Sequence, residues 1–178
     1  MAILSAKNVE YSYRTKYQTV HALKNISVEF ELGKMYAIVG SSGSGKTTLL
    51  SLLAGLDIPS EGQIYFDGTS IAEIDRDAWR LANVSVIFQN FNLFSHLTVL
   101  ENVSYLLCVK GLKKSMADIQ AKENLLSVGL SANMYNRFPA MLSGGEQQRV
   151  AIARCLSCNI PIILADEPTG NLDEENEE

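Results

Sequence analysis

Three short segments of this chain combine residue types and spacings that suit phosphate chemistry. The first matches the pattern G-x-x-x-x-G-K-[ST] and consists of Gly40, Ser41, Ser42, Gly43, Ser44, Gly45, Lys46 and Thr47. Its small side chains leave consecutive backbone N–H groups open to phosphate oxygens. Lys46 offers a cation to the β- and γ-phosphates, and the Thr47 hydroxyl can ligate Mg²⁺. The alternative is an ordinary glycine-rich turn, but an apolar run precedes the loop and a helical pattern follows it, which favours nucleotide binding.

A pair of carboxylates, Asp166 and Glu167, forms the second segment at the end of the apolar run 160–165. A strand this apolar is expected at the centre of a sheet, which would place Asp166 at the same sheet edge as the phosphate loop. There Asp166 can hold Mg²⁺, and Glu167 can orient a water for in-line attack and accept its proton. The alternative for Glu167 is an acid in the first turn of a helix, stabilised by the helix dipole. The phosphate loop upstream favours the catalytic interpretation.

The third segment, Ser143, Gly144 and Gly145, stands at the head of a predicted helix. A hydroxyl and bare N–H groups at the positive end of a helix form a second anion site. One chain rarely needs two such sites for a single γ-phosphate, whereas two chains facing head to tail would each cap the other's nucleotide. The segment therefore predicts a pair of chains with nucleotide between them.

With this third segment the chain resembles the ABC ATPase family over nearly its whole length. Residues 142–148 match the family signature, residues 40–47 its Walker A motif, and residues 162–167 its Walker B motif with the catalytic glutamate. The resemblance implies a P-loop NTPase of the α/β class, with an N-terminal antiparallel β subdomain, a parallel-sheet core and an inserted α-helical subdomain. It also implies binding and hydrolysis of ATP with Mg²⁺ as the cofactor.

Further positions match smaller motifs of the family. Gln89, which follows an apolar strand, resembles the Q-loop glutamine that senses Mg²⁺ and contacts the membrane domain. Residues 171–173 resemble the D-loop. Tyr13 resembles the aromatic residue that stacks on adenine. Tyr11 and Tyr17 are close rivals for that role, and an ordinary strand tyrosine is a further alternative.

The resemblance assigns these positions to sets by role. Nucleotide contacts are expected from Tyr13, Gly40, Ser41, Ser42, Gly43, Ser44, Gly45, Lys46, Thr47, Thr48 and Gln89. Metal contacts are expected from Thr47, Gln89 and Asp166, and catalysis is expected from Glu167 and Lys46. Contacts in trans to ATP are expected from the signature residues Ser143, Gly144, Gly145 and Glu146, and the D-loop contributes Asp173.

A subgroup of the family is also indicated. Residues 165–173, 88–89 and 97–103 resemble the group that exports macrolides, lipoproteins, bacteriocins and other antimicrobial peptides. This implies a bacterial exporter whose partners are a second, identical or homologous ATPase subunit and a separate integral membrane permease. The stretch from residue 90 to about residue 109 would belong to the surface that docks on the permease. The cargo, the identity of the permease and the direction of transport do not follow from the sequence.

The elements that must position these residues alternate between strands and helices. Period-two alternation or short apolar runs predict strands at residues 3–13, 23–30, 62–66, 84–88 and 160–165. Residues 35–39 are an apolar run that predicts a further strand, buried on both faces of a parallel sheet. Helices are predicted at residues 46–54, 75–82, 98–108, 115–128 and 144–156. The helical stretch within about 90–140 reads as an insert in an α/β core.

Composition and charge narrow the class of protein. The chain has 178 residues, 47% hydrophobic and 20% charged, which suits one domain over residues 1–178 with a buried core. Five acids among the last six residues account for the net charge of −5. The remaining chain has 15 acidic and 15 basic residues, which disfavours nucleic-acid binding. Without a run of about 18 apolar residues or a secretory signal, we expect a cytoplasmic protein, not inserted in the membrane but peripheral to it through the permease.

Three cysteines, Cys108, Cys155 and Cys158, are too few for a disulfide framework. The spacing C-x-x-C at Cys155 and Cys158 could be half of a zinc site, but a structural zinc takes four ligands. The two histidines, His21 and His96, lie far away in sequence. We therefore expect the cysteines to be structural residues on a packed helix.

The chain ends five residues after Asp173, before the position of the switch-loop histidine that the family carries. His21 and His96 both precede Glu167, so neither is that histidine. We therefore expect a C-terminally incomplete cassette that binds ATP better than it cleaves it. Two rival functions stay open, a soluble non-transport ABC ATPase of translation or DNA repair and a hydrolysis-deficient ATP-binding module.

Overall fold

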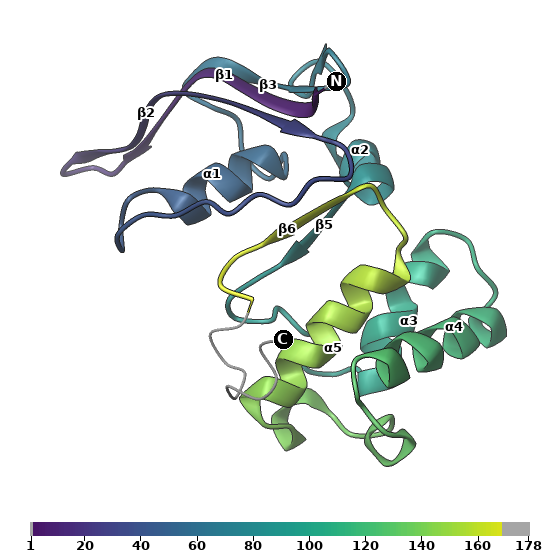
Figure 1. Cartoon of the computed structure of the whole chain (residues 1–178). Coiled ribbons are helices and arrows are strands. Elements are labelled where there is room, and N and C mark those ends of the chain that lie inside the picture. Colours follow the sequence, from purple (N-terminus) through teal and green to yellow (C-terminus); the bar gives the residue numbers. More distant parts are fainter. Residues whose placement is uncertain (1, 169–178) are drawn as a thin grey trace. The chain divides into compact units, whose positions relative to one another are not determined.

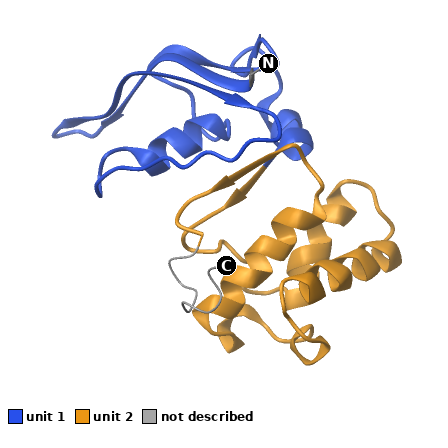
Figure 2. Ribbon diagram, in the orientation of Figure 1, with its two compact units in different colours: residues 1–84 blue, residues 85–178 orange. Residues whose placement is uncertain are grey.

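The computed structural model of the chain describes residues 2–168 and consists of two units, residues 1–84 and residues 85–178 (Figure 2). Each unit buries its own apolar side chains. Within the described residues, none of the helices combines the length and the apolarity that crossing a bilayer requires.

An antiparallel sheet forms most of the first unit. β1 (Ala2–Arg14) pairs with β2 (Thr19–Glu31) on one side and with β3 (Glu61–Phe66) on the other, and β4 (Thr69–Ser70) pairs with β3. The strand order is therefore β2-β1-β3-β4 (Figure 1). The antiparallel pairing confirms the sheet expected for the N-terminal part of the chain.

Two helices accompany this sheet. α1 (Lys46–Leu53) contacts β1 and β2, and its Leu52 and Leu53 are fully buried. α2 (Arg76–Asn83) begins after Asp75, whose carboxylate accepts hydrogen bonds from two backbone N–H groups of the first turn. Such a cap satisfies donors that have no partner inside a helix. Both helices lie where the sequence predicts them, within two residues.

One predicted strand of this unit does not form. Residues 35–39 belong to no strand in the structure, and Met35 and Val39 are 97% and 87% exposed. Side chains hold the segment instead, because the Tyr36 ring packs edge-on against Phe30 and its hydroxyl accepts a hydrogen bond of 3.1 Å from the backbone N–H of Glu31. The prediction of a buried strand is therefore wrong here. An apolar run becomes a strand only where a neighbouring backbone supplies hydrogen bonds, and the described strands supply none to it.

The second unit combines two strands with three helices. β5 (Val84–Ile87) and β6 (Ile162–Ala165) lie side by side and run in the same direction (Figure 1). Between them in sequence come α3 (Val99–Val109), α4 (Lys114–Ser127) and α5 (Gly144–Ser157), with short 3-10 turns at Ala132–Met134 and Pro139–Met141. The helices share one apolar core, made of Val99, Val103, Ala121, Leu125, Leu130, Leu142, Val150 and Ala153. This arrangement confirms the predicted helical insert between two strands.

β6 is less buried than its composition predicts. Ile162 is buried, but the next residue, Ile163, is 50% exposed. Among the described strands β6 pairs only with β5, and the pairing continues to Asp166, whose N–H donates to the carbonyl of Ile87 at 2.9 Å. The expectation of a central strand is therefore wrong among the described strands, because a strand is central only when it has a neighbour on each side.

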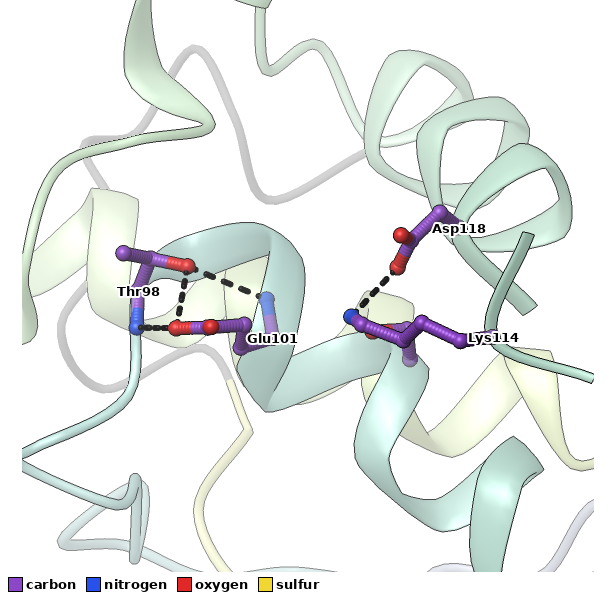
Figure 3. Close-up of polar contacts among 5 residues, drawn as sticks. Thr98, Glu101, Lys114 and Asp118 are labelled. Atoms are coloured by element: carbon purple, nitrogen blue, oxygen red, sulfur yellow. Dashed lines mark hydrogen bonds and ion pairs between the residues drawn. The ribbon is translucent and has the colours of Figure 1, made fainter.

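Polar side-chain contacts hold the start of α3 and link α4 to it. The N–H and hydroxyl of Thr98 donate to the Glu101 carboxylate at 2.8 Å each, and the Glu101 N–H donates to Thr98 Oγ1 at 3.3 Å (Figure 3). The backbone bond first, and then the hydroxyl bond, hold the pKa of Glu101 below its usual range. Lys114 donates to Asp118 at 2.7 Å and to the hydroxyl of Ser104 at 3.1 Å, which links α4 to α3.

A buried amide ties the segment before α3 to the helix. Asn102 is fully buried, and its Nδ2 donates to the carbonyls of Phe94, Leu97 and Thr98 at 3.1, 3.0 and 3.0 Å. Its Oδ1 accepts a hydrogen bond of 2.8 Å from the N–H of Phe94. Because a buried amide without partners is costly, this full set of bonds specifies one conformation for residues 94–98.

Candidate functional site

The glycine-rich loop of the first unit needs its last glycine for two reasons. Gly45 has φ 92°, a left-handed conformation that glycine adopts without strain. A Cβ at Gly45 would also lie 2.5 Å from the carbonyl oxygen of Ala22 and 2.8 Å from Leu23 Cδ2, so the start of α1 packs directly on β2. Gly45 gives α1 no side-chain cap. The first-turn N–H groups of α1 are therefore suited to an external anion.

Lys46 lies folded over this loop. Its Nζ donates to the carbonyls of Gly40 and Ser41, the first two residues of the loop, at 2.8 and 2.9 Å. The loop is closed on itself by a hydrogen bond of 3.2 Å from the N–H of Ser44 to the carbonyl of Ser41. The ammonium group is therefore already held at the loop, where phosphate oxygens can reach it. This arrangement fits the binding of a nucleotide triphosphate.

Tyr13 is the candidate tyrosine that contacts α1. Its hydroxyl lies 3.0 Å from Thr48 Oγ1, one residue after the loop, and the residue is 48% exposed. Tyr11 is committed elsewhere, because its hydroxyl donates to Asp57 and this bond, more than burial, raises the pKa of Tyr11 to about 12. Tyr17 is 90% exposed. An exposed ring anchored beside the phosphate loop is suited to stack on a base, which favours Tyr13 over both rivals.

In the second unit two predicted site residues meet directly. Gln89 Nε2 donates to Glu167 Oε2 at 2.7 Å, although the two residues are 78 positions apart in sequence. Gln89 follows β5, and Glu167 follows β6, so the pairing of these strands brings the two side chains together. Glu167 has φ 49°, an unusual conformation for a residue with a Cβ. Strained backbone of this kind is common where a side chain must point at a reacting group.

The turn after Gln89 is held by a residue that the sequence analysis did not select. Arg154, near the end of α5, donates from NH1 to the carbonyl of Asn92 at 2.7 Å and from NH2 to the carbonyl of Phe91 at 2.8 Å. Phe91 and Asn92 have φ 61° and 46°. A lone arginine within a helical pattern carries no local signal, so the sequence alone could not reveal this contact.

The signature segment begins α5 with a cap of its own. Ser143 Oγ accepts a hydrogen bond of 3.2 Å from the N–H of Glu146, and the Glu146 carboxylate accepts one of 2.7 Å from the N–H of Ser143. Ser143 and Gly144 are exposed. The pattern S-x-x-E could have predicted this capping box from the sequence. The N-terminus of α5 is therefore exposed, and the capping box already provides an acceptor for one of its first-turn N–H groups.

The cysteines are free thiols in the second unit. Cys155 and Cys158 are buried at the end of α5, and burial raises the pKa of both thiols. Within residues 2–168, no group of three or more His, Cys, Asp or Glu side chains is arranged to hold a metal ion. The burial of Cys155 and Cys158 at the C-terminal end of α5 agrees with the structural role expected for these cysteines.

The predicted site residues fall into two groups, one in each unit. The first unit holds the phosphate loop, Thr48 and Tyr13, which the structure brings together. The second unit holds Gln89, Asp166, Glu167 and the signature segment. The predicted D-loop, residues 171–173 with Asp173, lies outside the described residues.

Comparison with known proteins gives a consistent match. A sequence model of the family described as ABC transporter matches residues 23–170. The uncharacterized ABC transporter ATP-binding protein YclH of Bacillus subtilis strain 168 is 42% identical over 175 residues, covering 98% of this chain and 76% of YclH. The lipoprotein-releasing system ATP-binding protein LolD of Blochmanniella floridana is 42% identical over 177 residues, covering 98% of this chain and 75% of LolD.

A solved structure matches the fold as well. The dimeric, post-hydrolysis structure of the ATP-binding cassette MJ0796 of Methanocaldococcus jannaschii, bound to ADP and Pi, has a TM-score of 0.92 to this chain. The two sequences are 40% identical, and the match covers 97% of this chain and 77% of the other.

Proposed function

This chain belongs to the ABC transporter family, and we propose that its ATP binding and hydrolysis drive a separate membrane permease of the export type. The observation that carries the proposal is the hydrogen bond of 2.7 Å between Gln89 and Glu167. It joins the residue expected to sense the metal to the residue expected to activate water. Both side chains are exposed at the ends of neighbouring strands, where a bound nucleotide can reach them.

The phosphate loop is assigned to ATP. The close packing of Gly45 on β2 and the placement of Lys46 over the loop support this assignment. Lys46 neutralises charge on the β- and γ-phosphates, and the backbone N–H groups of residues 40–47 receive the phosphate oxygens. Tyr13 stacks on the adenine ring.

Mg²⁺ is assigned to oxygen ligands that suit it. The Thr47 hydroxyl, the Asp166 carboxylate and the Gln89 side-chain oxygen are the kinds of donor that Mg²⁺ prefers. When bound, the ion neutralises charge that develops on the phosphates. Gln89 has one amide and the structure shows its nitrogen on Glu167, so its oxygen remains for this role.

Glu167 is assigned to the attacking water. Its carboxylate is exposed, and one of its oxygens accepts the bond from Gln89. The other oxygen can orient a water and accept its proton as the water attacks the γ-phosphate. The reaction needs no covalent intermediate with the protein, because positioning and charge stabilisation supply most of the catalysis.

The signature segment is assigned to the contact with a second copy of the chain. Ser143 and Gly144 are exposed at the positive end of α5, and the solved relative MJ0796 is described as a dimer. Ser143, Gly144, Gly145 and Glu146 of one copy then meet the ATP held by the other. The candidate cargo classes are the lipoproteins, peptides or antibiotics that the sequence motifs imply, and the lipoprotein-releasing relatives support lipoproteins among them.

Replacement of Glu167 tests the proposal. Glu167→Gln keeps an oxygen that can accept the bond from Gln89 but removes the base, so ATP binding is expected to stay and phosphate release to fall by about 100-fold or more. ATP binding, phosphate release and the mass of the protein with ATP are measured side by side. The variant is expected to accumulate as an ATP-bound dimer. Glu123→Gln, an exposed change on α4, serves as the control.

Two results would contradict the assignment. Phosphate release by Glu167→Gln at the rate of the unchanged chain would remove Glu167 from catalysis. Purification with ribosomes or DNA in place of a permease would favour the soluble, non-transport class of ABC ATPase.

A further inference from the structure

The turn that follows Gln89 has a conformation that its own residues do not favour. Phe91 and Asn92 are consecutive left-handed residues, with φ 61° and 46°, and neither is glycine. Local hydrogen bonds from the N–H of Phe91 to the carbonyl of Phe88 and from the N–H of Asn92 to the carbonyl of Asn90 close the turn. Residues with a Cβ persist in this strained conformation only where the surrounding structure stabilises it.

Arg154 supplies that support. Its two terminal nitrogens donate to the carbonyls of Phe91 and Asn92 at 2.8 and 2.7 Å, so one planar guanidinium fixes both peptide groups. Burial lowers the pKa of Arg154, yet an arginine stays charged. No acidic side chain among residues 2–168 pairs with it, so the carbonyls of this turn are the groups that stabilise its charge.

The turn leads directly to the proposed catalytic pair. Gln89 precedes Phe91 by two residues, and its amide donates to Glu167 at 2.7 Å. We propose that Arg154 is a positioning residue for hydrolysis, which fixes this turn and thereby the Gln89 amide against Glu167. The proposal rests on the proposed function. It assigns Arg154 no contact with ATP, so its effect passes through Gln89.

Two substitutions at Arg154 separate positioning from general stability. Arg154→Met keeps the length and the apolar stem but loses both bonds, whereas Arg154→Lys keeps the charge and can reach one carbonyl. We expect Arg154→Met to lower kcat by about 10- to 100-fold, as small displacements of reacting groups do, with the KM for ATP changed by less than about threefold. Arg154→Lys should recover part of the loss. Lys122→Met, which removes an exposed charge from α4, should keep the original rate.

A readout without nucleotide complements the rates. Hydrogen exchange of the backbone N–H groups in residues 88–93 is measured in the full chain, together with its thermal unfolding. Exchange in this segment should be faster in Arg154→Met than in the unchanged chain and intermediate in Arg154→Lys. Unchanged exchange would overturn the proposal, because it would show that Arg154 does not hold the turn.

A double-mutant cycle with Gln89→Ala decides whether Arg154 acts through Gln89. If it does, Arg154→Met costs little in kcat once Gln89 is already replaced, since contacting residues that act as a unit are not additive. An equal cost of Arg154→Met in both backgrounds would overturn the positioning role while leaving the proposed function intact. Turnover that does not depend on Glu167 in any variant would overturn the proposed function itself, and this inference with it.

Discussion

The chain contains two helix N-termini that are expected to bind phosphate, and they are built in opposite ways. At α1 the cap residue is Gly45, which has no side chain, and the structure shows no side-chain cap and no acid in the first turn. At α5 the Ser143 hydroxyl accepts from the N–H of Glu146, and the Glu146 carboxylate accepts from the N–H of Ser143. Both helices carry the same positive dipole at this end.

The difference separates a permanent binding site from a conditional one. The N-terminus of α1 has neither a side-chain cap nor an acid in its first turn, so an anion suits it, and Lys46 adds a full positive charge. The N-terminus of α5 is capped by its own Ser143 and Glu146 side chains, and Glu146 also places a negative charge in the first turn. We infer that α1 binds nucleotide in a single chain, whereas α5 contacts nucleotide only when a second chain presents it.

The largest effect is expected from filling the space at Gly45. Gly45→Ala adds a methyl group 2.5 Å from the Ala22 carbonyl and requires a left-handed alanine, so the free energy of unfolding should fall by about 2–5 kcal/mol. Gly43→Ala is the matched control, because Gly43 has φ 77° but no atom within 4 Å of an added Cβ. Chemical denaturation measures both. Equal losses in the two variants would show that α1 does not need its close approach to β2.

Removal of the lysine is expected to have the next largest effect. Lys46→Ala deletes the cation at the loop, so the Kd for ATP should rise by about 10- to 100-fold, as for the loss of a hydrogen bond to a charged group. Isothermal titration with ATP measures it. The same experiment on Ser143→Ala should give an unchanged Kd for the single chain. A weaker Kd in Ser143→Ala would break the distinction between the two helix ends.

The smallest effect is expected at the cap of α5. Ser143→Ala should lower the free energy of unfolding by about 1 kcal/mol, because one first-turn donor loses its acceptor. Ser143→Asp keeps a capping oxygen and should retain the stability, but its negative charge opposes a nucleotide phosphate. ATP-dependent dimerisation, measured by light scattering in the Glu167→Gln background, should therefore be lost in Ser143→Asp. Retained dimerisation would mean that this helix end does not meet ATP.

The fold was predictable where the pattern of side chains is sufficient by itself. Period-two alternation gave β2, and the apolar period together with Gly129 gave the end of α4. The predictions for residues 35–39 and for β6 were wrong for the same reason. An apolar run indicates that burial is favourable, but it does not identify the strand that would cover or pair with it. Met35 is exposed because no described strand pairs with residues 35–39, and Ile163 is half exposed because β6 pairs with β5 alone among the described strands.

The site was predictable only where a motif is contiguous. Gln89 and Glu167 were selected separately from their local motifs, and the structure shows that they are in contact. Arg154 was missed because its partners lie 62 and 63 residues away, and no local sequence pattern indicates a contact over that distance. The contact between Asp166 and a metal, and the roles of the signature residues, stay predictions.

Two side chains, Asn102 and Arg154, hold the loop after β5, and their hydrogen bonds can form at different stages of folding. Asn102 bonds to residues only four to eight positions away, so this contact forms together with α3 and costs little loop-closure entropy. Arg154 bonds to residues more than 60 positions away, which become available only after α5 has docked. An early-forming and a late-forming part of the unit therefore join between Asn92 and Phe94. Partial unfolding of α5 would release Phe91 and Asn92, which Arg154 holds, and leave residues 94–98, which Asn102 holds, in place.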